Sequence, residues 1–253
     1  MTASTQQTKE RNRMRPLYLK GKERTKALVC YLPGGVYWGA HGRITGPDKG
    51  WVDARDLEFC KRVNKETGFD VCRKNYDVRS KWNDNKRIYV PHNWIQKNIY
   101  AFTKSEGYES LHLIGFSGGG SLASSQLLYY PNEMVQSLVI ISGPVANNPK
   151  AVHVNAAYYA DQITTRTLLV YGKDDGYRSH ADVWRRNNPA AVLREYDGGH
   201  DFQPQLGRVV KQVIDWQKTM KKPVLLARKR GRKRKRAQFL KLGPTRLKLV
   251  PTI

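Results

Sequence analysis

Residues 113–130, LIGFSGGGSLASSQLLYY, change from an apolar strand-like run to a glycine-rich turn and then to an apolar run with helical spacing. A lone serine, Ser117, stands at the point of change. Gly115 and Gly119 complete a G-x-S-x-G pattern around it, and such small neighbours allow a sharp strand-to-helix turn to lift a hydroxyl above the edge of a sheet. The following helix would point its N-terminal amides at whatever lies on that hydroxyl. A phosphate-binding G-x-x-x-x-G-K-[ST] pattern does not occur in the sequence.

Apolar, β-rich segments alternate with helical patterns on both sides of this stretch. The alternation predicts an α/β fold, with a mostly parallel twisted sheet of about six strands and helices on both faces. We expect strands at residues 27–33, 69–77, 110–116, 137–143, 167–172 and 191–197. We expect further helices at residues 51–68, 88–107 and 205–220.

The formal net charge of +24 belongs to the two ends of the chain. Residues 220–253 hold 13 Lys and Arg and no Asp or Glu, and residues 1–26 hold 8 Lys and Arg against 2 Glu. We therefore expect a basic flexible arm at 1–26, a folded domain at 27–220 and a highly basic tail at 221–253. Inside the domain, residues 144–166 are longer than a simple crossover needs, and they form either a small cap over a pocket or an ordinary connection.

Several protein classes are disfavoured by composition. No apolar run approaches ~20 residues, so no segment is expected to span a membrane. The polar start, MTASTQQTKERNRMRP, lacks the apolar core of a secretory signal. Three cysteines without C-x-x-C spacing favour a reducing, intracellular compartment.

A serine hydroxyl needs a base to become a nucleophile, and two later segments supply candidates in the order serine, acid, histidine. LLVYGKDDGY ends a predicted strand with Asp174 and Asp175 just past its carboxyl end. REYDGGHDF ends the last predicted strand and places His200 after two glycines. We expect His200 to act as general base on Ser117 and an aspartate to hold its tautomer. Asp175 is preferred because it lies three residues past Gly172, and Asp174 is the rival.

The segment YLPGGVYWG, residues 31–39, leaves the first predicted strand through two glycines whose bare amides can face a developing negative charge. The expected oxyanion donors are the amides of Gly35 or Val36 and of Gly118. The alternative interpretation of this segment is a plain Pro-Gly turn. No cofactor or metal is required by this chemistry.

With these parts in place, residues 27–220 resemble an α/β-hydrolase of the esterase and lipase kind. YLPGGVYWG resembles the H-G-G-G segment of that family, NYDVR the Y-R-L stretch, and GFSGGGSLA the segment G-D-S-A-G-G-N-L-A. YGKDD and GGH match its acid and base loops. The resemblance implies hydrolysis of an ester, or of a thioester or amide, through an acyl-enzyme. Two departures are that Pro33 replaces the histidine of H-G-G-G and that Val36 replaces its third glycine.

Two functions follow from these features. The first is a serine hydrolase that acts on a small acyl substrate. The second is a catalytically silent scaffold that binds nucleic acid or another acidic assembly through its basic termini. The run RKRGRKRKR would make the phosphate contacts, and it also fits a nuclear localisation signal. Its basic residues are Arg228, Lys229, Arg230, Arg232, Lys233, Arg234, Lys235 and Arg236.

Overall fold

A seven-stranded sheet organises the part of the chain that the computed structural model describes, which is residues 17–21, 26–34, 49–73, 95–146 and 156–219. Its strand order is β1-β3-β2-β4-β5-β6-β7. The strands are β1 (Leu17–Leu19), β2 (Ala27–Leu32), β3 (Asp70–Arg73), β4 (Ser110–Phe116), β5 (Val135–Ile141), β6 (Arg166–Gly172) and β7 (Val192–Tyr196).

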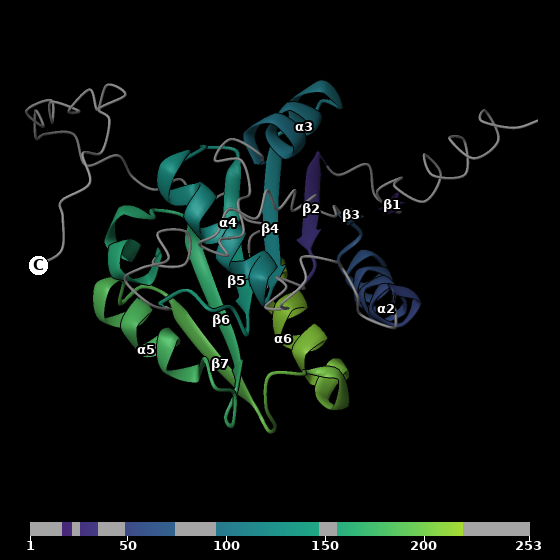
Figure 1. Ribbon diagram of the computed structural model, residues 1–253. Helices are drawn as coiled ribbons and strands as arrows, with labels where there is room; N and C mark the ends of the chain where they lie inside the picture. The colour runs from purple at the N-terminus through teal and green to yellow at the C-terminus, as the bar shows by residue number, and fades with distance from the viewer. Residues whose placement is uncertain (1–16, 22–25, 35–48, 74–94, 147–155, 220–253) are drawn as a thin grey trace, which may run out of the picture. The chain divides into compact units, whose positions relative to one another are not determined.

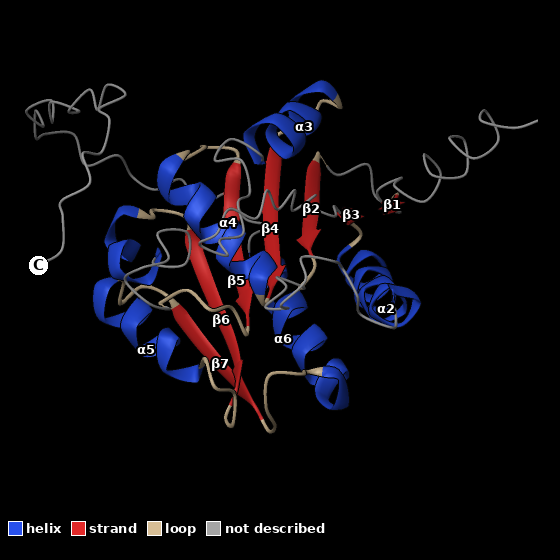
Figure 2. Cartoon of the chain, viewed as in Figure 1, coloured by secondary structure: helices blue, strands red, loops and turns tan. Residues whose placement is uncertain are grey.

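The six strands β3, β2, β4, β5, β6 and β7 pair in parallel with their neighbours, so their carboxyl ends meet at one edge of the sheet. Figure 2 shows the arrows of β2, β4, β6 and β7 pointing toward that edge. Strand β1 pairs antiparallel with β3. The prediction of a mostly parallel α/β sheet is confirmed. The expected number of strands was one too low, because β1 lies inside the segment predicted to be a flexible arm.

Helices lie on both faces of the sheet, as predicted (Figure 1). The α-helices are α2 (Lys49–Thr67), α3 (Ala101–Ser105), α4 (Gly118–Tyr129), α5 (Arg178–Asn187) and α6 (Leu206–Lys218). Shorter turns are η1 (Gln96–Tyr100), η3 (Ala156–Gln162) and η4 (Gln203–Gln205). The regular helix expected over residues 88–107 is instead, in its described part, the π-helical η1 followed directly by α3.

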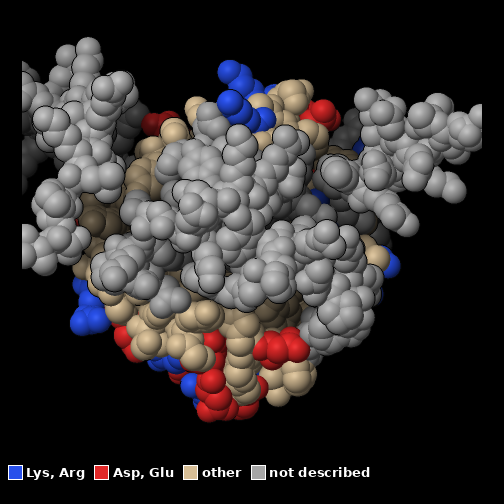
Figure 3. Space-filling model, viewed as in Figure 1, with Lys and Arg blue, Asp and Glu red and all other residues tan. Residues whose placement is uncertain are grey.

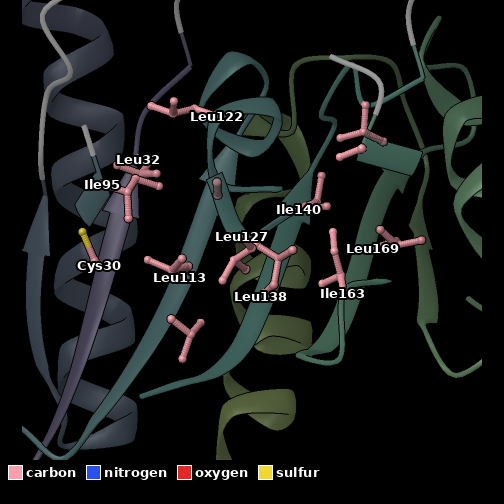
Figure 4. Packing of buried hydrophobic residues seen from close by; sticks show 14 of the residues in the cluster. Cys30, Leu32, Ile95, Leu113, Leu122, Leu127, Leu138, Ile140, Ile163 and Leu169 are labelled. Atoms are coloured by element: carbon pink, nitrogen blue, oxygen red, sulfur yellow. The ribbon is translucent and has the colours of Figure 1, made fainter. Parts of the chain in front are cut away.

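Side chains of each inner strand alternate between two hydrophobic layers, because successive side chains in a strand point to opposite faces. On β2, Leu28, Cys30 and Leu32 pack in the layer that includes α4, whereas Val29 and Tyr31 pack in the layer that includes α2 and α6. Figure 4 shows the first layer, with residues of the strands facing side chains of α4. Strands buried on both faces in this way are expected of a parallel sheet.

Strand β1 is held by side-chain contacts that join residues far apart in the sequence. The Tyr18 hydroxyl donates to Asp70 Oδ2 at 2.8 Å, and the Gly21 amide donates to Asp70 Oδ1 at 2.6 Å. The Tyr108 hydroxyl also donates to Asp70 Oδ2. Strand β1 has only three residues, which is too short for a periodic pattern in the sequence. It was not predicted because it is held by contacts with residues far away in the chain.

A buried histidine makes the stability of this fold dependent on pH. His112 on β4 stacks on Phe69 and lies 2.9 Å from Ser137 Oγ, and burial lowers its pKa to about 4. Below pH 6.5 the unfolded chain therefore binds a proton that the folded chain excludes. We expect the free energy of unfolding to lose roughly 3 kcal/mol through this group between pH 6.5 and pH 4.

Urea titrations of the protein and of His112→Asn across that pH range test this expectation. The difference in unfolding free energy between the two should shrink as the pH falls, because only the histidine protein carries this titration. A constant difference would show that His112 does not contribute.

The chain divides into two compact units, residues 1–222 and residues 223–253, and every described residue belongs to the first. The predicted basic tail at 221–253 thus lies outside the described residues, as does most of the predicted arm. Residues 147–155 of the predicted cap also lie outside them. In the described ranges, no helix has the length and apolar character needed to cross a lipid bilayer.

Candidate active site

Ser117 lies at the sharp turn between β4 and α4 that the G-x-S-x-G pattern predicted. Its backbone has φ 49° and ψ −121°, a region that residues with a side chain rarely occupy. Such a conformation costs about 1–3 kcal/mol and persists where the surrounding structure fixes it. The Ser117 amide donates to the Ile141 carbonyl at 2.8 Å, which ties the turn to the end of β5.

The glycines of the pattern leave room for close backbone contacts. A Cβ atom on Gly115 would lie 2.4 Å from the Gly119 oxygen, and one on Gly119 would lie 2.2 Å from the Leu32 oxygen. Both distances are far below van der Waals contact, so any side chain at either position would push β2, β4 and α4 apart. The glycines therefore let α4 begin directly above the strand ends.

His200 and Asp175 come to the same edge of the sheet as Ser117. His200 Nε2 lies 3.0 Å from Ser117 Oγ, and His200 Nδ1 lies 3.3 Å from Asp175 Oδ1. The Asp175 side chain is fully buried, whereas that of His200 is 40% exposed. Asp174, the rival acid, is exposed. The three residues selected from the sequence thus form a continuous line of contacts across 83 residues of chain.

Backbone hydrogen bonds clamp the loop that carries His200 to the loop that carries Asp175. The Lys173 amide donates to the Tyr196 carbonyl at 2.9 Å, and the Asp174 amide donates to the Gly198 carbonyl at 3.0 Å. Gly198 has φ 126°, which favours glycine. A Cβ atom on Gly172 would lie 2.2 Å from the Gly198 oxygen, so a glycine is needed where the loops approach.

The Asp175 carboxylate is held in its charged form. Burial by itself would raise its pKa, but hydrogen bonding from His200, from the Ser142 hydroxyl and from the Tyr177 amide lowers its pKa below the usual value. The Tyr177 amide donates to Oδ1 at 2.9 Å, the oxygen that also faces His200. An ionised carboxylate in this place favours the tautomer with a proton on His200 Nδ1, which leaves Nε2 free to accept a proton.

Two aromatic rings pack against the imidazole. The Phe116 ring lies 5.5 Å from the His200 ring, and the Tyr177 ring meets it edge-on at 5.4 Å. Phe116 also packs edge-to-face on Phe202. These contacts limit the orientations of the imidazole without covering it.

Gly118, the first residue of α4, is the only expected oxyanion donor among the described residues. Gly35 and Val36 lie outside the described residues. Gly34, the last described residue before them, lies close to the serine, because a Cβ atom on Gly34 would lie 3.1 Å from the Ser117 Cβ. The segment that leaves β2 therefore starts beside the serine.

The loops that follow β6 and β7 carry exposed acidic side chains at the carboxyl ends of these strands. Figure 3 shows acidic side chains at the lower end of the molecule in this view, where β6 and β7 end. The loops after these two strands carry the exposed Asp174, Asp197 and Asp201. Lys173 and Arg208 form ion pairs with Asp197. The large positive net charge is therefore not a property of this edge, and the predicted polyanion-binding residues at 228–236 lie outside the described residues.

Sequence patterns did not identify two polar residues behind the site, Ser142 and Tyr196. Ser142 follows β5 with φ 50°, and its Oγ lies 2.9 Å from the Tyr196 hydroxyl. The only sequence signal for Ser142 is a serine followed by a glycine at the end of a predicted strand, and this pattern also occurs in many ordinary turns. Among the described residues, no group of three or more His, Cys, Asp or Glu side chains could hold a metal ion.

The sequence matches a family model described as serine hydrolase (FSH1) over residues 52–213. This match includes Ser117, Asp175 and His200 but neither Gly35 nor the basic tail. Comparison with curated proteins finds no match.

Several solved structures share the fold at low sequence identity. Est1E of Butyrivibrio proteoclasticus, with bound ferulic acid, is 13% identical with a TM-score of 0.60, over 82% of this chain and 96% of that one. An α/β hydrolase from the metagenome of Mar Chica lagoon sediments, Morocco, is 20% identical with a TM-score of 0.54, over 81% and 95%. A monoacylglycerol lipase of Paleococcus ferrophilus is 15% identical with a TM-score of 0.56, over 80% and 98%.

The family match covers most of the chain, and the solved structures that share its fold include an α/β hydrolase. The sequence-based resemblance to an α/β-hydrolase is therefore confirmed. The chain belongs to the serine hydrolase (FSH1) family, and it is a serine hydrolase of the α/β-hydrolase fold.

Proposed function

We propose that the protein hydrolyses a carboxylic ester through an acyl-enzyme formed on Ser117, with His200 as general base and Asp175 as its partner. The observation that carries the proposal is the line of contacts from Ser117 Oγ to His200 Nε2 at 3.0 Å and from His200 Nδ1 to Asp175 Oδ1 at 3.3 Å. A hydroxyl and a base within hydrogen-bond reach, with the base oriented by a third group, is the arrangement that nucleophilic catalysis requires.

In the first half of the reaction, Ser117 Oγ attacks the acyl carbonyl while its proton passes to His200 Nε2. The resulting imidazolium is stabilised by the Asp175 carboxylate, which remains ionised. His200 then gives the proton to the departing alcohol, and the acyl group stays on the serine. In the second half, His200 takes a proton from water and the hydroxide attacks the acyl carbonyl. The bond from the acyl carbon to Ser117 Oγ then breaks, His200 returns the proton to Oγ, and the carboxylic acid leaves.

The negative charge on the carbonyl oxygen requires donors at the start of α4. The Gly118 amide is one candidate, because the N-terminal amides of a helix have no partner within the helix and the helix dipole favours negative charge there. Gly35 or Val36 would supply the second amide. This assignment rests on the position of Gly34 beside the serine and on the resemblance of YLPGGVYWG to the family segment.

The proposed substrate is a small ester. The solved structures that share the fold include esterases and a monoacylglycerol lipase. Thioesters and amides would react with Ser117 by the same route, at different rates. His200 is 40% exposed, so the base is open to a substrate carbonyl at the strand-end edge.

Rapid mixing with p-nitrophenyl acetate tests the acyl-enzyme route. We expect a burst of p-nitrophenol close to one equivalent of protein, followed by a slower steady rate, whenever deacylation limits turnover. Hydroxylamine should accelerate the steady rate by capturing the acyl group. Hydrolysis that is unaffected by Ser117 labelling would contradict the proposal.

We also propose that the basic tail, with 13 Lys and Arg and no acid over residues 220–253, binds nucleic acid or another polyanion. Replacing the eight basic residues of the run at 228–236 by glutamine should weaken binding to a duplex oligonucleotide and flatten its salt dependence. Ester hydrolysis should not change. Equal binding by both proteins at two salt concentrations would assign any affinity to another part of the chain.

A further inference from the structure

Two buried hydroxyl groups lie behind the proposed catalytic residues and connect to the loop that carries the histidine. The Tyr196 hydroxyl donates to the Gly199 carbonyl at 3.0 Å, immediately before His200. Ser142 Oγ lies 2.9 Å from the same Tyr196 hydroxyl. A phenol has one proton, so with that proton on Gly199 the Ser142 hydroxyl is the donor to Tyr196. Ser142 and Tyr196 are both fully buried.

The second oxygen of the proposed acid lacks a hydrogen bond. Asp175 Oδ2 is buried and has no hydrogen-bond partner among the described residues, whereas Oδ1 receives both the Tyr177 amide and His200. A buried carboxylate oxygen without a donor is costly. The Ser142 hydroxyl, which contacts Tyr196, also contributes to keeping the pKa of Asp175 low against the effect of burial.

The backbone at Ser142 is in a strained conformation that holds the hydroxyl in this place. Its φ of 50° is one of only two positive values among the described non-glycine residues, and the other belongs to Ser117. The Ser142 amide donates to the Val170 carbonyl at 2.8 Å, which fixes the turn against β6. Strain of this kind persists where the surroundings impose it, and it is concentrated at functional sites.

We propose that Ser142 and Tyr196 are positioning residues for the catalytic centre. The Ser142 hydroxyl holds the Tyr196 hydroxyl, and the Tyr196 hydroxyl fixes the loop so that His200 Nε2 remains on the serine oxygen. The inference rests on the proposed catalytic roles of Ser117, Asp175 and His200. Neither positioning residue touches the substrate, so their loss slows the covalent step and leaves substrate binding unchanged.

Tyr196→Phe in the full chain removes only the hydroxyl and keeps the ring in the core. We expect kcat for p-nitrophenyl acetate to fall by about 10- to 100-fold, the scale for misplacing a catalytic group, with KM changed less than about twofold. Tyr100→Phe is the matched control, because Tyr100 is another buried phenol whose hydroxyl donates to a carbonyl, that of Tyr130 at 3.3 Å. This control should keep the parent kcat.

Ser142→Ala and Ser125→Ala form a second matched pair. Ser125 is a buried serine in α4 whose hydroxyl bonds to the Ser121 carbonyl, so its removal costs a comparable hydrogen bond away from the proposed acid. We expect kcat to fall for Ser142→Ala only. If Tyr196→Phe does not fold, Ser142→Gly decides the question, because glycine accepts a φ of 50° and lacks the hydroxyl.

Proton NMR gives a measurement that needs no substrate. The proton on His200 Nδ1, shared with Asp175, should give a low-field resonance in the parent protein and in both controls. It should broaden or disappear in Tyr196→Phe and Ser142→Ala. Retention of this resonance and of the parent kcat in both variants would overturn the inference. Failure of the proposed function would look different, because the parent protein itself would then carry no label on Ser117.

Discussion

Ser117→Ala should lose about 10⁶-fold in kcat for ester hydrolysis, the scale expected when a nucleophile that works as a unit with its base is removed. Covalent labelling by a fluorophosphonate should be lost as well. The reason is the 3.0 Å contact between Ser117 Oγ and His200 Nε2, which no other hydroxyl among the described residues makes with that nitrogen. Steady-state kinetics and in-gel labelling with a fluorescent fluorophosphonate measure both effects.

A second variant separates chemistry from folding in this experiment. Ser117 has φ 49°, so alanine adds strain at this turn, whereas Ser117→Gly removes the hydroxyl and accepts the backbone. Both variants should be inactive, and the glycine variant should unfold at the higher temperature. Ser125→Ala should label at the parent rate. An active, labelled Ser117→Gly protein would contradict the assigned nucleophile.

Asp175→Asn should lower kcat by about 10⁴-fold with little change in KM. The asparagine amide can donate to His200 Nδ1, which places the imidazole proton on Nε2, where it can no longer accept the proton of Ser117. The 3.3 Å contact between Asp175 Oδ1 and His200 Nδ1 motivates this prediction. Because the pKa of Asp175 is lowered, the parent protein keeps this carboxylate charged at neutral pH, so the loss in the variant should be seen there.

Asp174→Asn is the matched control, since this neighbouring aspartate is exposed and makes no side-chain contact with His200 in the described structure. We expect its kcat to remain within about twofold of the parent value, as for other surface substitutions away from the site. Equal losses in the two variants, or a loss confined to Asp174→Asn, would mean that the wrong acid has been assigned.

Most of the sheet could be predicted from the sequence because its strands carry their signal locally. The runs at β4 and β6 are mostly apolar and buried in their middle, as expected of strands covered on both faces, and their ends agree closely with the predicted ranges. Strand β1 depends instead on pairing with β3 and on Tyr18 reaching Asp70, which are contacts across about 50 residues. No window of sequence around Leu17–Leu19 contains that information.

The candidate site could be predicted where a serine, aspartate or histidine lies close to a glycine just after a predicted strand. Ser117, Asp175 and His200 each follow a predicted strand, and parallel strands bring their carboxyl ends to one edge of the sheet. The choice of Asp175 over Asp174 rested on its position three residues past Gly172, and the burial of Asp175 and its contact with His200 favour the same choice. Ser142 and Tyr196 have no such pattern, because their relation depends on how two neighbouring strand ends approach in space.

Peptide mass spectrometry of the full chain after reaction with a fluorophosphonate tests the central proposal most directly. We predict a single phosphonyl adduct, on Ser117 within the segment GFSGGG, that does not form in the presence of excess ester substrate or after heat denaturation. An adduct on another residue, or equal labelling of native and denatured protein, would contradict the account of Ser117 as an activated nucleophile.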